Sequence, residues 1–155
     1  MIACLAKFNG RIAIFGDRLQ SLLLLLVRLY WGWQFFIAGK GKLSDLSRPT
    51  QYFSSLGIPA PHLSAVVVSG TECFGGLLLL LGLGSRFFSA IFILEMIVAY
   101  VTSEQDALRA IFSDSDKFVT ATPFLFLFAS AIIFIFGPGR YSLDAVISKK
   151  SASRR

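Results

Sequence analysis

The sequence predicts an all-α integral membrane protein, a bundle of four transmembrane helices preceded by an amphipathic segment. Hydrophobic residues make up 55% of the 155 positions, and sixteen of them are phenylalanine, more than the core of a small soluble domain can hide. Four apolar stretches approach the roughly 20 residues that a helix needs to cross a hydrocarbon core of about 30 Å. They cover about residues 19–38, 63–83, 86–102 and 118–136.

Residues 1–18 are too short and too interrupted to form a span. Apolar and basic positions fall on different faces of a helix there, which is typical of a segment at the membrane interface. We prefer this interpretation to a signal peptide because no small-residue cleavage site follows and the apolar run continues to spanning length. The predicted organisation is therefore an N-terminal amphipathic segment (1–18), a membrane domain (19–145) and a basic cytoplasmic tail (146–155).

The connections between the spans carry turn and capping signals. In the first connection, Pro49 and Gly57 bracket a predicted short helix. Only Gly84 and Ser85 separate the second and third spans, which predicts a tight helical hairpin. The second connection, 103–117, predicts one short surface helix, and its DSD sequence predicts an N-cap for the fourth span.

The basic residues flank the apolar stretches, although the net charge is +6. This distribution is typical of topology signals and lipid headgroup contacts, so we expect a lipid bilayer as the partner and no nucleic acid. Four spans place both termini on the same side of the membrane. That side holds nine Lys and Arg residues and the opposite side holds five, and because the more basic side is usually cytoplasmic, we predict cytoplasmic termini. The nine are Lys7, Arg11, Arg18, Arg86, Arg140, Lys149, Lys150, Arg154 and Arg155.

Three ionisable residues lie well inside the predicted spans, namely Arg28, Glu72 and Glu95. Each is nine to eleven positions from its cytoplasmic end, about 13–17 Å deep at 1.5 Å per residue. A charge at this depth costs on the order of 2–3 kcal/mol or more, so it needs compensation. We therefore predict an Arg28–Glu72 pair with Glu95 close by, in which one carboxyl group is protonated or has a strongly shifted pKa.

This charged group has two interpretations. It is either an ion-paired clasp that fixes helix register or a proton-accepting or substrate-binding centre, in which Arg28, Glu72 and Glu95 are the catalytic candidates. Two further residues are candidates for binding a cofactor. Trp31 either stacks on a quinone or packs in the bundle, and Lys42 either extends the centre or extends toward headgroups. No spacing of Cys, His or carboxylates predicts a metal site.

Five groups of residues resemble motifs of the DoxX family of small bacterial membrane proteins. They are Arg28 with Gly32 and Phe36, Gly39-x-x-Lys42-Leu43, Phe53-x-x-Leu56-Gly57-Ile58-Pro59, Glu72-x-x-Gly75-Gly76-x-Leu78-Leu79-Leu80-x-Gly82, and the segment Gly137–Asp144. The resemblance implies a four-helix protein of the bacterial inner membrane, often encoded with redox or metal-handling partners. One relative looks like the membrane subunit of a thiosulfate:quinone oxidoreductase, and others are linked to thiol and oxidative stress.

These observations lead to a function hypothesis and two alternatives. The hypothesis is a membrane subunit or partner of a redox system that handles thiol or sulfur compounds or oxidative stress, with quinone as its cofactor and no complete enzyme in this chain alone. The first alternative is a membrane anchor or assembly partner without catalytic activity. The second is a small transporter, which would require a homo-oligomer because each chain has only four spans.

The charge distribution makes the orientation testable. In a chain whose Cys4 and Cys73 are replaced, cysteines introduced at Ser47 and Ser113 should react with a membrane-impermeant thiol reagent on intact cells. A cysteine in the C-terminal tail should react only after the membrane is opened. Protection of both loop cysteines together with labelling of the tail would reverse the orientation.

Overall fold

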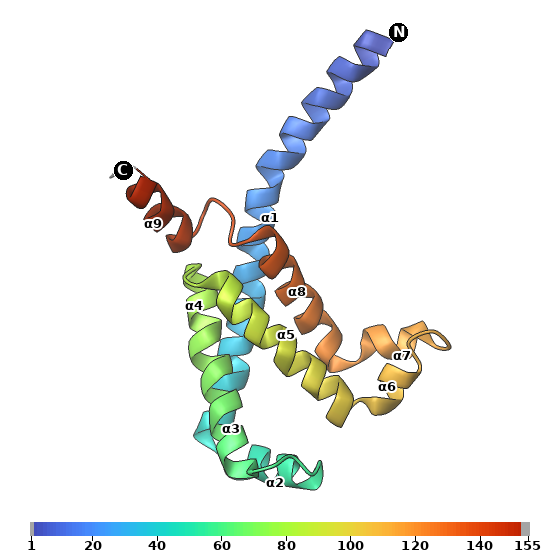
Figure 1. Cartoon of the computed structure of the whole chain (residues 1–155), viewed down its shortest axis with the longest axis vertical. Coiled ribbons are helices and arrows are strands. Elements are labelled where there is room, and N and C mark those ends of the chain that lie inside the picture. The colour runs from blue at the N-terminus through green and yellow to red at the C-terminus, as the bar shows by residue number, and fades with distance from the viewer. Residues whose placement is uncertain (1, 153–155) are drawn as a thin grey trace.

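The computed structural model describes residues 2–152, with side chains described for residues 19–150. The all-α prediction is confirmed, since the described residues contain helices and no strand (Figure 1). In chain order the helices are α1 (Ile2–Ser44), α2 (Ser47–Ser55), α3 (Pro61–Gly70), the π-helix η1 (Thr71–Gly75), α4 (Gly76–Leu81), α5 (Ser85–Thr102), α6 (Gln105–Arg109), α7 (Ser115–Thr120), α8 (Thr122–Phe136) and α9 (Leu143–Ala152).

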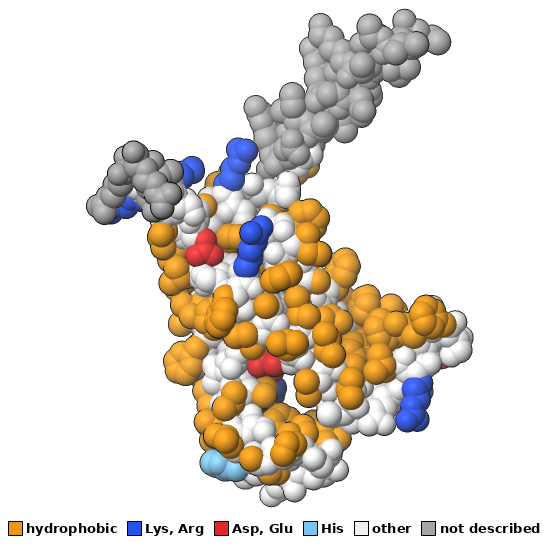
Figure 2. Space-filling view, viewed as in Figure 1, with side chains coloured by type: hydrophobic (Ala, Val, Ile, Leu, Met, Phe, Trp, Pro, Cys, Tyr) orange, Lys and Arg blue, Asp and Glu red, His pale blue; other side chains and the backbone are white. Residues whose placement is uncertain are grey.

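Three helical stretches are long and apolar enough to cross a membrane, namely Leu19–Ser44, Pro61–Leu81 and Ser85–Thr102. Hydrophobic side chains cover most of the visible helical surface, and basic side chains lie toward the two ends (Figure 2). The first stretch extends six residues beyond its predicted end, so Lys42 belongs to the last turn of α1 instead of a loop. The short helix between Pro49 and Gly57 forms as α2.

The fourth predicted span is not one continuous helix. Ala121 has an extended backbone and separates α7 from α8, which then contains only 15 residues. At 1.5 Å per residue α8 is about 22 Å long, shorter than the hydrocarbon core. Pro123 explains the break, because a proline has no N–H to donate and is tolerated in the first turn of a helix. Asp114 caps α7 by accepting a hydrogen bond from the Lys117 N–H, so it does not cap the fourth span as expected.

The three long apolar helices and the shorter α8 form two packed pairs. α1 packs antiparallel to the continuous segment α3–η1–α4, and α5 packs on α8. The pairs meet near the turn between α4 and α5 and diverge toward the opposite end of the molecule (Figure 1). α1 begins at Ile2 as one helix, and the amphipathic face predicted for 1–18 lies outside the described side chains. α9 crosses the predicted boundary between membrane domain and tail.

An aromatic layer joins the two pairs. Phe35 of α1 stacks on Phe92 of α5, with ring centroids 3.8 Å apart. Phe126 of α8 packs edge-on against both Phe35 and Trp31, at 4.9 and 4.8 Å. Leu79 completes the layer from α4. Trp31 is therefore part of the helix packing.

Glycines bring α1 and the α3–η1–α4 segment into backbone contact. A Cβ on Gly39 would overlap the Cys73 amide nitrogen and lie 2.7 Å from the Ser69 oxygen. A Cβ on Gly76 would lie 2.5 Å from the Phe36 nitrogen. Small residues allow this approach between membrane helices, and here they fix which residues of the two helices face each other.

The close approach at Gly39 predicts a large difference between two neighbouring glycines. Gly39→Ala should lower the free energy of unfolding by about 1–3 kcal/mol, because the added methyl group meets backbone atoms that cannot move aside. The matched control is Gly41→Ala, where no atom lies within 4 Å, and helix propensity should stabilise that variant by up to about 1 kcal/mol. Unfolding of the purified protein in mixed micelles with increasing dodecyl sulfate measures both. Equal stability of the two variants would contradict the packing.

Candidate functional site

The ionisable residues of the spans separate into two sites at different levels of the bundle. Arg28 lies near the turn between α4 and α5, whereas Glu72 lies near the last turn of α1. Lys42, which contacts Glu72, follows Arg28 by fourteen residues, or about 21 Å of α1. The aromatic layer around Phe35 lies between the two levels.

Arg28 is completely buried, and its Nη2 donates a hydrogen bond to the Tyr141 carbonyl. Gly82 makes room for the guanidinium, because a Cβ there would overlap Nη1. Gly82 also has a φ of +71°, a conformation that glycine adopts without strain. Arg28 therefore links α1, the end of α4 and the segment before α9.

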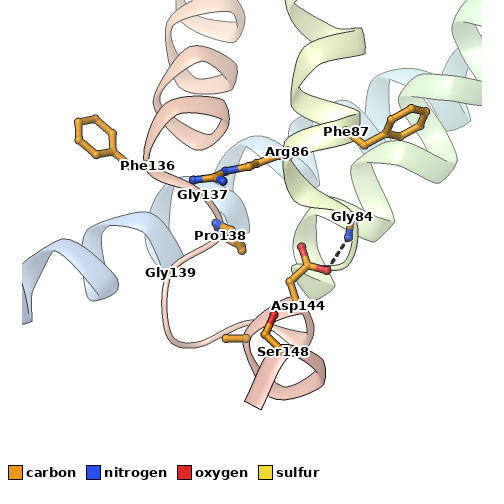
Figure 3. Close-up of a pocket in the computed structure, with 10 residues that line it drawn as sticks. Gly84, Arg86, Phe87, Phe136, Gly137, Pro138, Gly139, Asp144 and Ser148 are labelled. Carbon is orange, nitrogen blue, oxygen red and sulfur yellow. Dashed lines mark hydrogen bonds between the residues drawn. The ribbon is translucent and has the colours of Figure 1, made fainter. Parts of the chain in front are cut away.

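Asp144 completes this first site. Its carboxylate accepts hydrogen bonds from the N–H groups of Gly84 and Ser85, at 2.9 and 3.1 Å, and so caps the start of α5 (Figure 3 shows the bond to Gly84). Its own N–H donates to the Gly82 carbonyl at 3.0 Å. The carboxylate lies in the vicinity of Arg28 but forms no salt bridge with it. Asp144 thus ties the C-terminal segment to the hairpin.

The predicted Arg28–Glu72 pair is wrong. Gly82 lies opposite Arg28, and Glu72 is ten residues earlier in the chain, about 15 Å along the helix. The predicted depth of Arg28 was counted from Leu19 as the start of the span. In the structure α1 begins far before Leu19 and continues to Ser44, so Leu19 does not mark an end of the helix. The three charges of the spans therefore do not share one level.

Glu72 pairs with Lys42. The Lys42 Nζ lies 2.6 Å from Oε1 and 2.7 Å from Oε2 of Glu72, which makes a bidentate contact. The Glu72 side chain is 6% exposed and that of Lys42 is 37% exposed, so the pair connects the interior with the surface. Glu72 lies in the π-helix η1, a wider turn that is frequent at functional sites. Packing at Gly39 brings η1 close enough for Lys42, one turn later, to reach it.

Glu95 contributes a second carboxyl to this site from α5. Glu72 and Lys42 lie near it, and its Oε2 is buried without a hydrogen-bond partner among the described residues. We call these three residues the Lys42–Glu72–Glu95 cluster. One ammonium group faces two carboxyl groups there, so the cluster holds one carboxyl group more than the ammonium can neutralise.

The residues expected to bind a quinone do not converge. Arg28 is enclosed near Gly82, and Trp31 packs in the aromatic layer on Phe126. Of the predicted candidates, only Lys42, Glu72 and Glu95 come together, and we assign no step to a quinone. Among the described residues, no group of three His, Cys, Asp or Glu side chains is placed to hold a metal ion. Sequence reasoning missed Asp144, whose only signal was its position at the end of the 137–144 motif.

Comparisons with known proteins identify one matching family model and two similar proteins. The DoxX family model matches residues 23–105. A Bacillus subtilis (strain 168) protein named "Putative oxidoreductase CatD" is 30% identical over 125 residues, which cover 81% of this chain and 87% of the relative. "Inner membrane protein YqjF" of Escherichia coli (strain K12) is 28% identical over 136 residues, covering 86% of this chain and 98% of the relative. No solved structure matches.

The new pairing changes the expected coupling between charges. Lys42→Met and Glu72→Leu should each lower the free energy of unfolding by about 1–3 kcal/mol, less than for a fully buried pair because Lys42 is partly exposed. The double variant should recover much of this loss, since both charges leave together. Arg28→Leu combined with Glu72→Leu should be additive within about 0.5 kcal/mol, because these residues share no contact. Denaturation in mixed micelles measures both cycles, and additivity of the Lys42 and Glu72 variants would contradict the pair.

Proposed function

The chain belongs to the DoxX family of membrane proteins, and we propose that it is the inner-membrane component of a redox system. In this system a partner protein carries the electrons, and this chain takes up and releases the protons that accompany them. The observation that carries the proposal is the Lys42–Glu72–Glu95 cluster. Ionisable side chains inside spans are expensive and mark proton or ion pathways by default. The description of the Bacillus subtilis relative as an oxidoreductase supports a redox setting.

The cluster has the chemistry of a proton-exchange site. Lys42 neutralises one carboxylate, and the second carboxyl group is left to bind or release a proton. The partial exposure of Lys42 gives protons a route from the surface at the end of α1. The Glu95 Oε2 is buried and has no partner among the described residues, so no hydrogen bond to this oxygen favours one protonation state over the other.

In this proposal Arg28 has a structural role and takes no part in proton exchange. Its hydrogen bond to Tyr141 and its enclosure by Gly82 place it in a link between segments, away from the cluster. A membrane anchor without catalytic activity is the competing proposal. It predicts that the cluster only fixes the fold, so that any variant which folds also functions.

A neutral variant of Glu95 separates the two proposals. In a strain without the gene, Glu95→Gln should reach the same membrane level as the parent chain but protect cells from a thiol oxidant no better than an empty vector does. The control is Lys40→Met, which removes an exposed charge near the end of α1, the helix that carries Lys42, and should leave protection unchanged. Infrared difference spectra of the purified parent across pH should show a carboxyl band that Glu95→Gln lacks. Full protection by Glu95→Gln would favour the anchor.

A further inference from the structure

A pocket lies beside the Arg28 site, on the outer side of the segment that follows α8. Its volume is about 430 Å³, and its walls include Arg86, Phe87, Phe136, Pro138 and Ser148 (Figure 3). We propose that this pocket binds the headgroup phosphate of an anionic phospholipid. The proposal is independent of the proton exchange at the Lys42–Glu72–Glu95 cluster, which lies at the other level of the bundle.

The pocket is positioned at the edge of the apolar region. α5 begins at Ser85 and α8 ends at Phe136, so the ends of both helices meet there. The phenylalanines of its wall are exposed on the molecular surface, Phe87 by 66% and Phe136 by 56%. A phospholipid bound there would place its phosphate in the pocket and an acyl chain along these rings, because apolar surface inside a bilayer contacts lipid tails.

Arg86 supplies the charge for the phosphate. Its guanidinium extends toward Gly137, between Phe136 and Pro138 (Figure 3). It makes one long hydrogen bond, 3.4 Å from Nη2 to the Ile135 carbonyl, and no other among the described residues. An arginine fork matches two phosphate oxygens, so most of its donors remain for a ligand.

The acidic group of the pocket does not cancel this charge. Both carboxylate oxygens of Asp144 accept N–H groups, from Gly84 and Ser85, at the start of α5. These bonds direct its negative charge toward the helix N-terminus, which carries a partial positive charge. Arg86 is therefore the group on the wall that can pair with an anion.

A second pocket of about 380 Å³ extends the basic surface. It shares Phe136, Gly139 and Ala145 with the first pocket and adds Arg140 to its wall. Lys149 and Lys150 follow on α9, whose Val146 and Ile147 are exposed beside them. Basic side chains at the end of a span attract an anionic lipid surface. The charge complementarity favours an anionic headgroup over a zwitterionic one.

Lipid titration of the full chain tests the proposal. In zwitterionic detergent, short-chain phosphatidylglycerol should raise the thermal unfolding midpoint in a saturable way, and phosphatidylcholine of the same chain length should not. Arg86→Gln should weaken the phosphatidylglycerol effect by about tenfold, because the charged donor of the wall is lost. Arg86→Lys should retain part of the effect. Arg109→Gln is the matched control, since it removes an exposed charge from α6 at the opposite end.

Three outcomes would overturn the proposal. Equal stabilisation by phosphatidylglycerol and phosphatidylcholine would show that the headgroup charge is not recognised. An unchanged midpoint shift in Arg86→Gln, with normal unfolding in the absence of lipid, would place the lipid elsewhere. Stabilisation by inorganic phosphate alone, without any effect of the lipid, would make free phosphate the ligand.

Discussion

The backbone contact between α1 and the α3–η1–α4 segment decides the geometry of the whole molecule. Gly39 lies against the Cys73 amide, and Gly76 lies against the Phe36 amide, so neither helix can slide without a clash. This register places Gly82 opposite Arg28 and brings Glu72 within reach of Lys42. Apolar surfaces alone do not fix such a register in a bilayer, because lipid tails are as apolar as leucine. The Arg28 site and the Lys42–Glu72 pair therefore both depend on glycine–backbone contacts, which involve no polar side chain.

The two sites hold buried charge in different ways. At the first site, Arg28 is enclosed and donates one hydrogen bond to a main-chain carbonyl, while its Nε and Nη1 have no partner among the described residues. At the second site, a side-chain ion pair compensates Glu72, while Glu95 keeps a buried oxygen without a partner among the described residues. The first arrangement joins α1, the Gly82 turn and the segment before α9, as a structural link does. The second leaves a group that can change its charge state, which is the property that a proton-exchange site needs.

The first site also explains why motifs that lie far apart in the sequence belong together. Arg28, the Gly82 turn and the 137–144 segment form one contact set around the hairpin. The glycines at 137 and 139 turn the chain with positive φ, so that Tyr141 and Asp144 can return to α4 and α5. The headgroup pocket proposed above is the outer surface of this same turn. The turn closes the bundle on its inner side, and in our proposal it binds lipid on its outer side.

Local sequence patterns determined the elements of this fold. Three of the four apolar stretches predicted helices long enough to span a membrane, Gly84 and Ser85 predicted the hairpin, and Pro49 with Gly57 predicted α2, because backbone conformation and burial in lipid depend on neighbouring residues. Only the tertiary structure decided which charges meet. The partner of Glu72 depends on how far α1 extends past Ala38 and on which glycines of two helices face each other. A shift of one turn moves a side chain by 5.4 Å, more than the length of an ion pair, and no pattern within one helix specifies that shift.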